Sequence, residues 1–421
     1  MTVHVTRLAN GMAVASDAMD GIETAAVGVW VGAGARDETP EINGVSHMLE
    51  HMAFKGTRRR SAADIVDEVE SVGGHINAYT SRENTAYYLR VLAKDVPLAV
   101  DILADILRNS TFDPDELERE RAVIVQEIGQ AADTPDDVIF DHFQAVAYPD
   151  QALGRPVLGS LETVSALRRD AVARYMGENY GAERMVLAAA GKVDHDALVR
   201  LAEEHFAAIP ARGAAPEDPA RYVGGEDIRP RDLEQVHIVL GFEGVAYEDP
   251  DYYAMSALSA ILGGGMSSRL FQEIREKRGL VYSIYSFASS YRDGGLLGVY
   301  AGTGEDEVAA LMPVLTGELA RIGATITRHE IERVKAQLKA GLLMAMERTR
   351  ARAERLGQHM LIYGRPLPPE EIVERIEAVD EAAIARVAGR VFSGSPTLAA
   401  LGRVGRFGGL PSVTESLRAV G

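Results

Sequence analysis

The sequence repeats itself weakly on either side of a central segment. A strand-like run at residues 27–32 opens the first half, and a similar run at 236–241 opens the second. Near the end of the first half, residues 187–193 are echoed by residues 398–404, so both offsets are about 210 residues. A repeat of this length predicts two copies of one structural unit rather than a single continuous core.

Each copy is predicted to run from a strand through a helix to paired strands and then long helices. This order indicates the α+β class, with two homologous α/β sandwich domains, each a mostly antiparallel or mixed sheet with helices packed on it. Residues 210–230, rich in Pro, Gly and charge, are the predicted linker between domains 1–209 and 231–421. The repeated elements are strands at 86–91 and 296–301 and amphipathic helices at 96–107 and 306–322.

Composition excludes several kinds of site and partner. The net charge of −18 argues against a nucleic-acid partner and favours basic peptides, although plain solubility explains the charge equally well. Because the chain has no cysteine, any zinc site must use histidine and carboxylate ligands. Residues 1–8 do not resemble a signal peptide, and no apolar run approaches a membrane span, so we expect a cytoplasmic protein without membrane contact.

His47, Glu50 and His51 form an H-x-x-E-H pattern. On a helix, imidazoles at positions i and i+4 project from one face, so His47 and His51 can hold one zinc ion. Glu50 lies beside them as a candidate base for a metal-bound water, and the order is that of the inverted zincin pattern. The alternative is a surface helix that carries these residues by chance. The chain has only ten histidines, and two of them share this turn, which favours the metal site.

The helix around this pattern is supported by its apolar positions. Asn43 or Ser46 is a candidate N-cap, and Gly56 suits the end of the helix. The apolar face is predicted to pack against the core while the histidines lie on a different face. That apolar stripe consists of Val45, Met48, Leu49 and Met52.

A tetrahedral zinc site with an open position needs a third protein ligand. The best source is a predicted helix over residues 113–127, with Asp113 as its cap and Pro114 in its first turn. Glu120 and Glu127 lie seven residues apart on one face of this helix, so that one could bind metal while the other supports the site. Spacing alone leaves the matter open, because acidic residues are common near helix N-termini.

With Glu127 placed 76 residues after His51, the sequence resembles the M16 (pitrilysin-type, inverzincin) zinc metallopeptidases. Within that family it is similar to the β-subunit of the mitochondrial processing peptidase and its bacterial relatives. The likeness spans nearly the whole chain and includes residues 52–57, Met-Ala-Phe-Lys-Gly-Thr. The resemblance implies that His47, His51 and Glu127 bind one zinc per chain. It also implies that Glu50 activates the water and that Glu120 is a supporting residue beside the site.

Residues 73–88 are predicted to form a strand, a short turn and another strand. An edge strand can bind an extended peptide by main-chain pairing, although a purely structural strand has the same pattern. The resemblance implies that Asn77, Ala78 and Tyr79 line the cleft and pair with the substrate. His75 is predicted to be a strand side chain rather than a fourth ligand.

The second half lacks an H-x-x-E-H copy, but residues 263–282 contain a glycine turn, a basic helix and the start of a strand. The phosphate-binding G-x-x-x-x-G-K-[ST] pattern is absent from it. The resemblance matches Arg275 and Tyr282 to a pair that reaches the peptide and the tetrahedral intermediate opposite the zinc. The resemblance also implies that a chain of this length forms one half of a clamshell, which is one wall of a closed chamber. The resemblance therefore implies a homodimer in which Arg275 and Tyr282 of one protomer complete the zinc site of the other.

A further predicted helix begins with Thr134 as its cap and Pro135 in its first position. Asp137 and Asp141 share one face of it, and a preference for acids in first turns explains Asp136 and Asp137 better than Asp141. The resemblance implies that Asp137 and Asp141 bind an arginine near the cleavage point, although Asp137 stands where the mitochondrial enzymes usually have glutamate.

The predicted function is a zinc-dependent endopeptidase of peptides or unfolded, presequence-like segments. One alternative is a non-catalytic structural subunit, against which the intact set of His47, Glu50, His51 and Glu127 argues. Another is a subunit that is active only with a different partner chain, against which the retained Arg275 and Tyr282 weigh.

Overall fold

The computed structural model describes residues 2–214, 219–405 and 408–420, and the chain packs into two compact units. The first unit contains Met1–Gly129, Arg155–Glu217 and Leu343–Leu367. The second contains Gln130–Gly154, Asp218–Leu342 and Pro368–Gly421. These units differ from the contiguous domains 1–209 and 231–421, because each half of the chain contributes one segment to the unit built mainly from the other half.

The first unit is built on a six-stranded sheet with the strand order β1-β2-β6-β3-β5-β4. β2 and β6 are parallel, and the other neighbouring strands are antiparallel. The strands are β1 (Thr2–Arg7), β2 (Ala13–Ala18), β3 (Thr24–Val31), β4 (His75–Thr80), β5 (Thr85–Leu92) and β6 (Met185–Gly191). The α-helices are α1 (Val45–Ala53), α2 (Ala62–Ser71), α3 (Val96–Arg108), α4 (Pro114–Ala132, which runs on past the unit boundary), α6 (Leu161–Ala166), α7 (Arg169–Asn179), α8 (His195–Phe206) and α12 (Thr349–Tyr363). The short 3-10 turns are η1 (Ala35–Asp37), η2 (Pro40–Ile42), η3 (Ala93–Asp95) and η5 (Ala182–Arg184).

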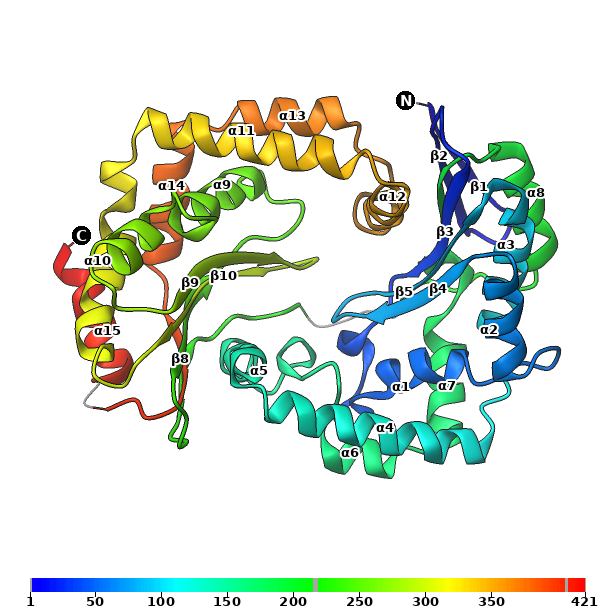
Figure 1. Cartoon of the computed structure of the whole chain (residues 1–421), viewed down its shortest axis with the longest axis horizontal. Helices are drawn as coiled ribbons and strands as arrows, with labels where there is room; N and C mark the ends of the chain where they lie inside the picture. The colour runs from blue at the N-terminus through cyan, green and yellow to red at the C-terminus, as the bar shows by residue number, and fades with distance from the viewer. Residues whose placement is uncertain (1, 215–218, 406–407, 421) are drawn as a thin grey trace. The chain divides into compact units, whose positions relative to one another are not determined.

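Both faces of the first sheet are covered. On one face α1, α3 and α8 contribute buried apolar side chains to the larger core of this unit. On the other face α12 lies beside β3 (Figure 1) and also packs against β6. Leu356 and Met360 of α12 belong to a buried cluster that contains Trp30. Gly357 allows this approach, because a Cβ atom there would lie 2.4 Å from the Trp30 indole. The lack of a side chain at Gly357 therefore lets α12 pack closely against Trp30 on this sheet.

The second unit is built on a five-stranded sheet with the order β7-β11-β8-β10-β9, in which only β7 and β11 are parallel. The strands are β7 (Gly225–Arg229), β8 (Val236–Glu243), β9 (Ser283–Ser290), β10 (Gly295–Thr303) and β11 (Thr397–Leu401). The helices are α5 (Pro135–Ala147), the 3-10 turn η4 (Ala152–Gly154), α9 (Tyr252–Gly263), the π-helix η6 (Phe271–Glu276), α10 (Val308–Thr325), α11 (Arg328–Ala345, which crosses the unit boundary), α13 (Pro369–Glu377), α14 (Glu381–Phe392) and α15 (Gly409–Val420). β7 lies within the predicted linker 210–230, so part of that segment is a strand.

The second sheet is also covered on both faces. α9, α10 and α14 pack on one face, and Figure 1 shows α10, α14 and α15 gathered on that side. α5 covers the other face, where Phe143 lies over Gly241 of β8. Helix α10 is long and apolar enough to cross a membrane by composition, but Leu311, Leu315 and Leu319 are buried in the core of this unit. Burial in the unit explains the apolar composition of α10.

The two sheets share one topology. In the first, β6 lies between β2 and β3, and β5 pairs with β4; in the second, β11 lies between β7 and β8, and β10 pairs with β9. The predicted strands at 27–32 and 236–241 correspond to β3 and β8. The predicted α+β class and the internal repeat are therefore confirmed.

Candidate metal centre

Helix α1 carries the H-x-x-E-H residues, but it is capped differently from the prediction. Its N-cap is Gly44, whose φ of 97° lies in the left-handed region that favours glycine. Neither Asn43 nor Ser46 acts as the N-cap, so that prediction was wrong. Glu38, which comes before the helix, takes the role that a capping side chain usually has.

The Glu38 carboxylate accepts hydrogen bonds from backbone and side-chain donors at the start of α1. The backbone N–H groups of Gly44 and Ser46 each donate at 2.8 Å, and Asn43 Nδ2 donates at 2.7 Å. The Ser46 hydroxyl also donates to it. Glu38 is only 4% exposed, so burial raises the pKa of its carboxyl, while these hydrogen bonds oppose the rise. The first turn of α1 is thus fixed by a buried carboxylate.

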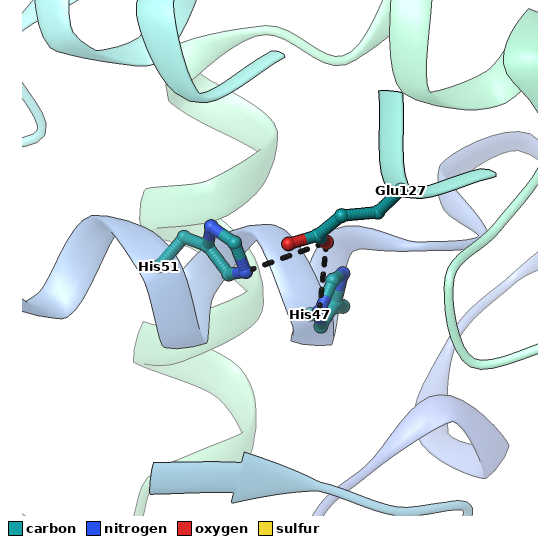
Figure 2. A group of neighbouring side chains, drawn as sticks. All are labelled: His47, His51 and Glu127. Carbon is teal, nitrogen blue, oxygen red and sulfur yellow. Dashed lines mark ion pairs between the residues drawn. The ribbon is translucent and has the colours of Figure 1, made fainter. Parts of the chain in front are cut away.

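His47, His51 and Glu127 converge from two helices. The Nε2 atoms of His47 and His51 each lie 3.8 Å from Oε2 of Glu127, and the three potential ligand atoms lie within 4.8 Å of one another (Figure 2). Ligand atoms on a tetrahedral zinc at ~2.1 Å lie roughly 3.4 Å apart, so these residues fit a zinc ion with little movement. Within residues 2–214, 219–405 and 408–420 this is the one such group of three.

Glu120 supports the group from the second helix, α4. Its Oε2 atom lies 2.8 Å from Nδ1 of His51, and Lys55 Nζ lies 2.6 Å from its Oε1. Burial raises the pKa of the Glu120 carboxyl, but the hydrogen bonds from Lys55 and His51 outweigh it and lower the pKa below the usual value. A charged Glu120 holds the proton of His51 on Nδ1, which leaves Nε2 free to bind a metal.

The environment of His47 keeps its imidazole neutral. Burial and the neighbouring His51 lower the pKa of His47 to about 4. A histidine must be neutral to bind a metal, so His47 is ready to act as a ligand at neutral pH. Its Nδ1 atom is buried and has no hydrogen-bond partner in the described part of the chain.

Glu50 lies on the same helix and contacts the end of β4. Thr80 Oγ1 donates a hydrogen bond of 2.6 Å to Glu50 Oε2. Burial raises the pKa of Glu50, and the hydroxyl and backbone N–H of Thr80 oppose this rise. A carboxylate whose pKa is raised towards neutrality is suited to accepting and returning a proton. Thr80 was not singled out in the sequence, because no local pattern links it to a residue thirty positions earlier.

Glu127 lies on α4, the helix that was predicted over residues 113–127. α4 begins at Pro114, and Asp113 caps it, since Asp113 Oδ1 accepts from the backbone N–H of Asp115 at 2.9 Å and of Glu116 at 3.3 Å. The predicted helix over 113–127 is therefore confirmed, and it continues to Ala132.

Asn77, Ala78 and Tyr79 lie on β4, the edge strand of the first sheet. The Asn77 side chain is exposed and accepts a hydrogen bond of 2.8 Å from the Ala78 backbone N–H. Tyr79 faces α12, and burial raises its pKa to about 12, with the charge of Glu354 adding to the rise. His75 is exposed on the same strand and is not part of the metal-binding group.

Arg275, Tyr282, Asp137 and Asp141 belong to the second unit. Arg275 lies in the π-helix η6, with its guanidinium 4.8 Å from the centre of the Phe271 ring. Tyr282 is 62% exposed just before β9. Asp137 is exposed and Asp141 half-buried on α5.

Thr134 occupies the N-cap position of α5, but its side chain does not cap the helix. Its hydroxyl donates to the Gln130 carbonyl instead. The predicted boundary of this helix is therefore confirmed, whereas the predicted side-chain cap was wrong.

Comparison with known families agrees with this geometry. Residues 13–161 match the model of the insulinase family, peptidase family M16, and residues 166–338 match the model described as the peptidase M16 inactive domain. The chain belongs to peptidase family M16. This M16 protein is therefore a metallopeptidase, and its family implies zinc as the metal.

Several relatives and one solved structure are similar to this M16 peptidase. It is 40% identical to an uncharacterized zinc protease of Rickettsia bellii over 400 residues, covering 95% of this chain and 97% of that protein. It is 41% identical to the mitochondrial-processing peptidase subunit beta of Lentinula edodes over 405 residues, covering 91% and 86%. A protease from Helicobacter pylori has the same fold, with a TM-score of 0.88 at 22% identity, covering 95% of this chain and 99% of that one.

Proposed function

We propose that the chain is a zinc-dependent endopeptidase that cleaves peptides and unfolded, presequence-like segments. The observation that carries this proposal is the convergence of His47 Nε2, His51 Nε2 and Glu127 Oε2 beside the partly buried carboxylate of Glu50. We assign these three atoms as the ligands of one zinc ion per chain. A purely structural subunit would have no need for the four residues together.

When bound, zinc would act as a Lewis acid that polarises the scissile carbonyl and makes a water molecule acidic. Glu50 would accept a proton from the attacking water and pass it to the leaving amine. Glu120 would keep His51 in the tautomer that presents Nε2, through the 2.8 Å contact with Nδ1. Arg275 and Tyr282 would donate hydrogen bonds to the carbonyl oxygen as it gains negative charge.

The substrate is proposed to bind as an added strand on β4. One edge of β4 pairs with β5, and in the described sheet no strand pairs with its other edge. Main-chain pairing at Asn77, Ala78 and Tyr79 would hold many sequences in extended form. The net charge of −18 favours basic peptides, and we assign Asp137 and Asp141 as a site for arginine near the cleavage point.

Cleavage of a quenched peptide library, with and without arginine at each position, tests this function. Wild-type protein is expected to cut within peptides and to prefer arginine at a fixed distance from the cut. Asp137→Asn and Asp141→Asn should weaken that preference while preserving cleavage of arginine-free peptides. Zinc binding without cleavage of any peptide would refute the endopeptidase function and favour a structural subunit or a missing partner chain.

We further propose a homodimer in which Arg275 and Tyr282 of one protomer complete the zinc site of the other. One sequence carries both sets of residues, which supports this assembly. Mixing inactive Tyr282→Phe with inactive Glu50→Gln should restore part of the activity, because the mixed dimer would contain one intact site. No recovery, despite subunit exchange shown by native mass spectrometry, would contradict it.

A further inference from the structure

The hydrogen bond between Thr80 and Glu50 joins the edge strand to the helix that carries the candidate base. Thr80 is the last residue of β4 and follows Asn77, Ala78 and Tyr79 directly. Side chains alternate along a strand, so Ala78 and Thr80 point to one face and Tyr79 to the other. Ala78 packs against the core that contains α1, and Tyr79 packs against the cluster that contains α12. The Thr80 hydroxyl therefore lies on the same face of the sheet as α1.

The turn that follows Thr80 is held in place by the neighbouring backbone. Ser81 N donates to Asn84 O at 2.8 Å, and Asn84 N donates to the Ser81 hydroxyl at 3.1 Å. Ala35 N donates to Ser81 O at 3.1 Å, and Arg36 N donates to Arg82 O at 2.7 Å. As the last residue of β4, Thr80 thus connects the strand that we propose to bind the peptide to a fixed turn.

A glutamate side chain has three rotatable bonds, and ordering it costs conformational free energy. A short hydrogen bond from a neutral hydroxyl to a carboxylate selects one orientation of that carboxylate. The hydroxyl donates to Oε2, one of the two oxygens of the Glu50 carboxylate.

We propose that Thr80 is a positioning residue that holds the Glu50 carboxylate for proton transfer and links its orientation to the strand on which the peptide binds. This inference rests on the proposed peptidase function. The role of Thr80 is to fix Glu50; it neither binds the metal nor exchanges a proton with the substrate.

The test compares Thr80→Val, which keeps the branched shape but removes the hydroxyl, with Thr80→Ser, which keeps the hydroxyl. Thr80→Val should lower kcat roughly 10-fold or more, as expected for loss of one hydrogen bond to a charged group, with KM and zinc content unchanged. Thr80→Ser should remain close to wild type. The matched control is Thr85→Val, because Thr85 Oγ1 donates to Ala33 O in the same hairpin. This control should lower stability without lowering kcat.

Crystal structures of the variants supply a readout that does not depend on activity. The Glu50 carboxylate should leave its wild-type position in Thr80→Val and keep it in Thr80→Ser. An unchanged kcat in Thr80→Val, an equal loss in Thr80→Ser, or an unmoved Glu50 in Thr80→Val would overturn the proposal. If wild-type protein cuts no peptide, the proposed function fails, and the position of Glu50 in these crystals still decides the role of Thr80.

Discussion

Replacing Glu38 by glutamine should loosen the first turn of α1 and weaken the metal centre. The carboxylate accepts from Gly44 and Asn43 on one oxygen and from Ser46 on the other. An amide NH2 in place of either oxygen would face a backbone N–H that cannot turn away. Asn43 could reverse its own amide only by losing its 3.0 Å hydrogen bond to the Pro156 carbonyl.

The size of the effect follows from these contacts. A buried donor left without an acceptor costs roughly 1–3 kcal/mol, and the loss of a charge at a helix N-terminus adds about 0.5 kcal/mol. Burial raises the pKa of Glu38, so a neutral amide avoids part of the desolvation cost of the carboxylate, which reduces the loss. We expect the free energy of unfolding of the first unit to fall by about 2 kcal/mol.

Trp30, the one tryptophan in the chain, is buried in the first unit and reports the unfolding of that unit by fluorescence. Urea titrations of metal-free protein would compare wild type, Glu38→Gln and the control Glu41→Gln, whose side chain is exposed. Zinc affinity, measured by competition with a chelator, should fall in Glu38→Gln and remain unchanged in Glu41→Gln. Ordinary surface substitutions change the free energy of unfolding by about 0.5 kcal/mol or less. If Glu38→Gln differs from wild type by no more than that, the capping role of Glu38 is wrong.

Two further predictions concern stability. Burial raises the pKa of Glu330, but hydrogen bonds from Arg269 and Thr327 outweigh this effect and lower the pKa from 4.5 to about 2. The ionised Glu330 therefore stabilises the fold above about pH 4.5, and this contribution is lost as the pH falls towards 2. In urea titrations of the full chain, Glu330→Gln should have a lower free energy of unfolding of the second unit than wild type at pH 7, and this difference should narrow by about pH 3. A difference that does not change with pH would contradict the assignment. Gly357→Ala should destabilise the first unit by about 1–3 kcal/mol, since its Cβ would meet the rigid Trp30 ring at 2.4 Å. The control Gly389→Ala, which has open space in helix α14, should be neutral or slightly stabilising, and equal melting temperatures for both variants would refute the packing argument.

The features predicted correctly from the sequence are those set by short-range periodicity. The spacing of His47 and His51 placed both imidazoles on one face of α1, and Asp113 with Pro114 marked the start of α4. The repeated strand patterns also predicted two sheets of like topology. The two histidines and the helix start depend on residues within a few positions of one another, and the repeat was visible because similar short patterns recur about 210 residues apart.

The features that were missed depend on contacts between residues far apart in the sequence or on backbone geometry. The sequences of α5 and α12 do not indicate which sheet each helix covers. That depends on packing contacts between distant residues, such as Trp30 against Gly357. The start of α1 was expected to be capped by a local side chain, but the left-handed Gly44 and the preceding Glu38 fill that role. Thr80 reaches Glu50 only because the sheet places β4 beside α1.

The central claim is that His47, His51 and Glu127 hold zinc while Glu50 transfers protons. Zinc content, zinc affinity and peptide cleavage measured side by side for wild type, Glu50→Gln and Glu127→Gln test it most directly. We predict that Glu50→Gln retains zinc but loses cleavage, and that Glu127→Gln loses both zinc affinity and cleavage. Zinc bound by Glu127→Gln with wild-type affinity, or peptide cleavage by Glu50→Gln at the wild-type rate, would contradict the account.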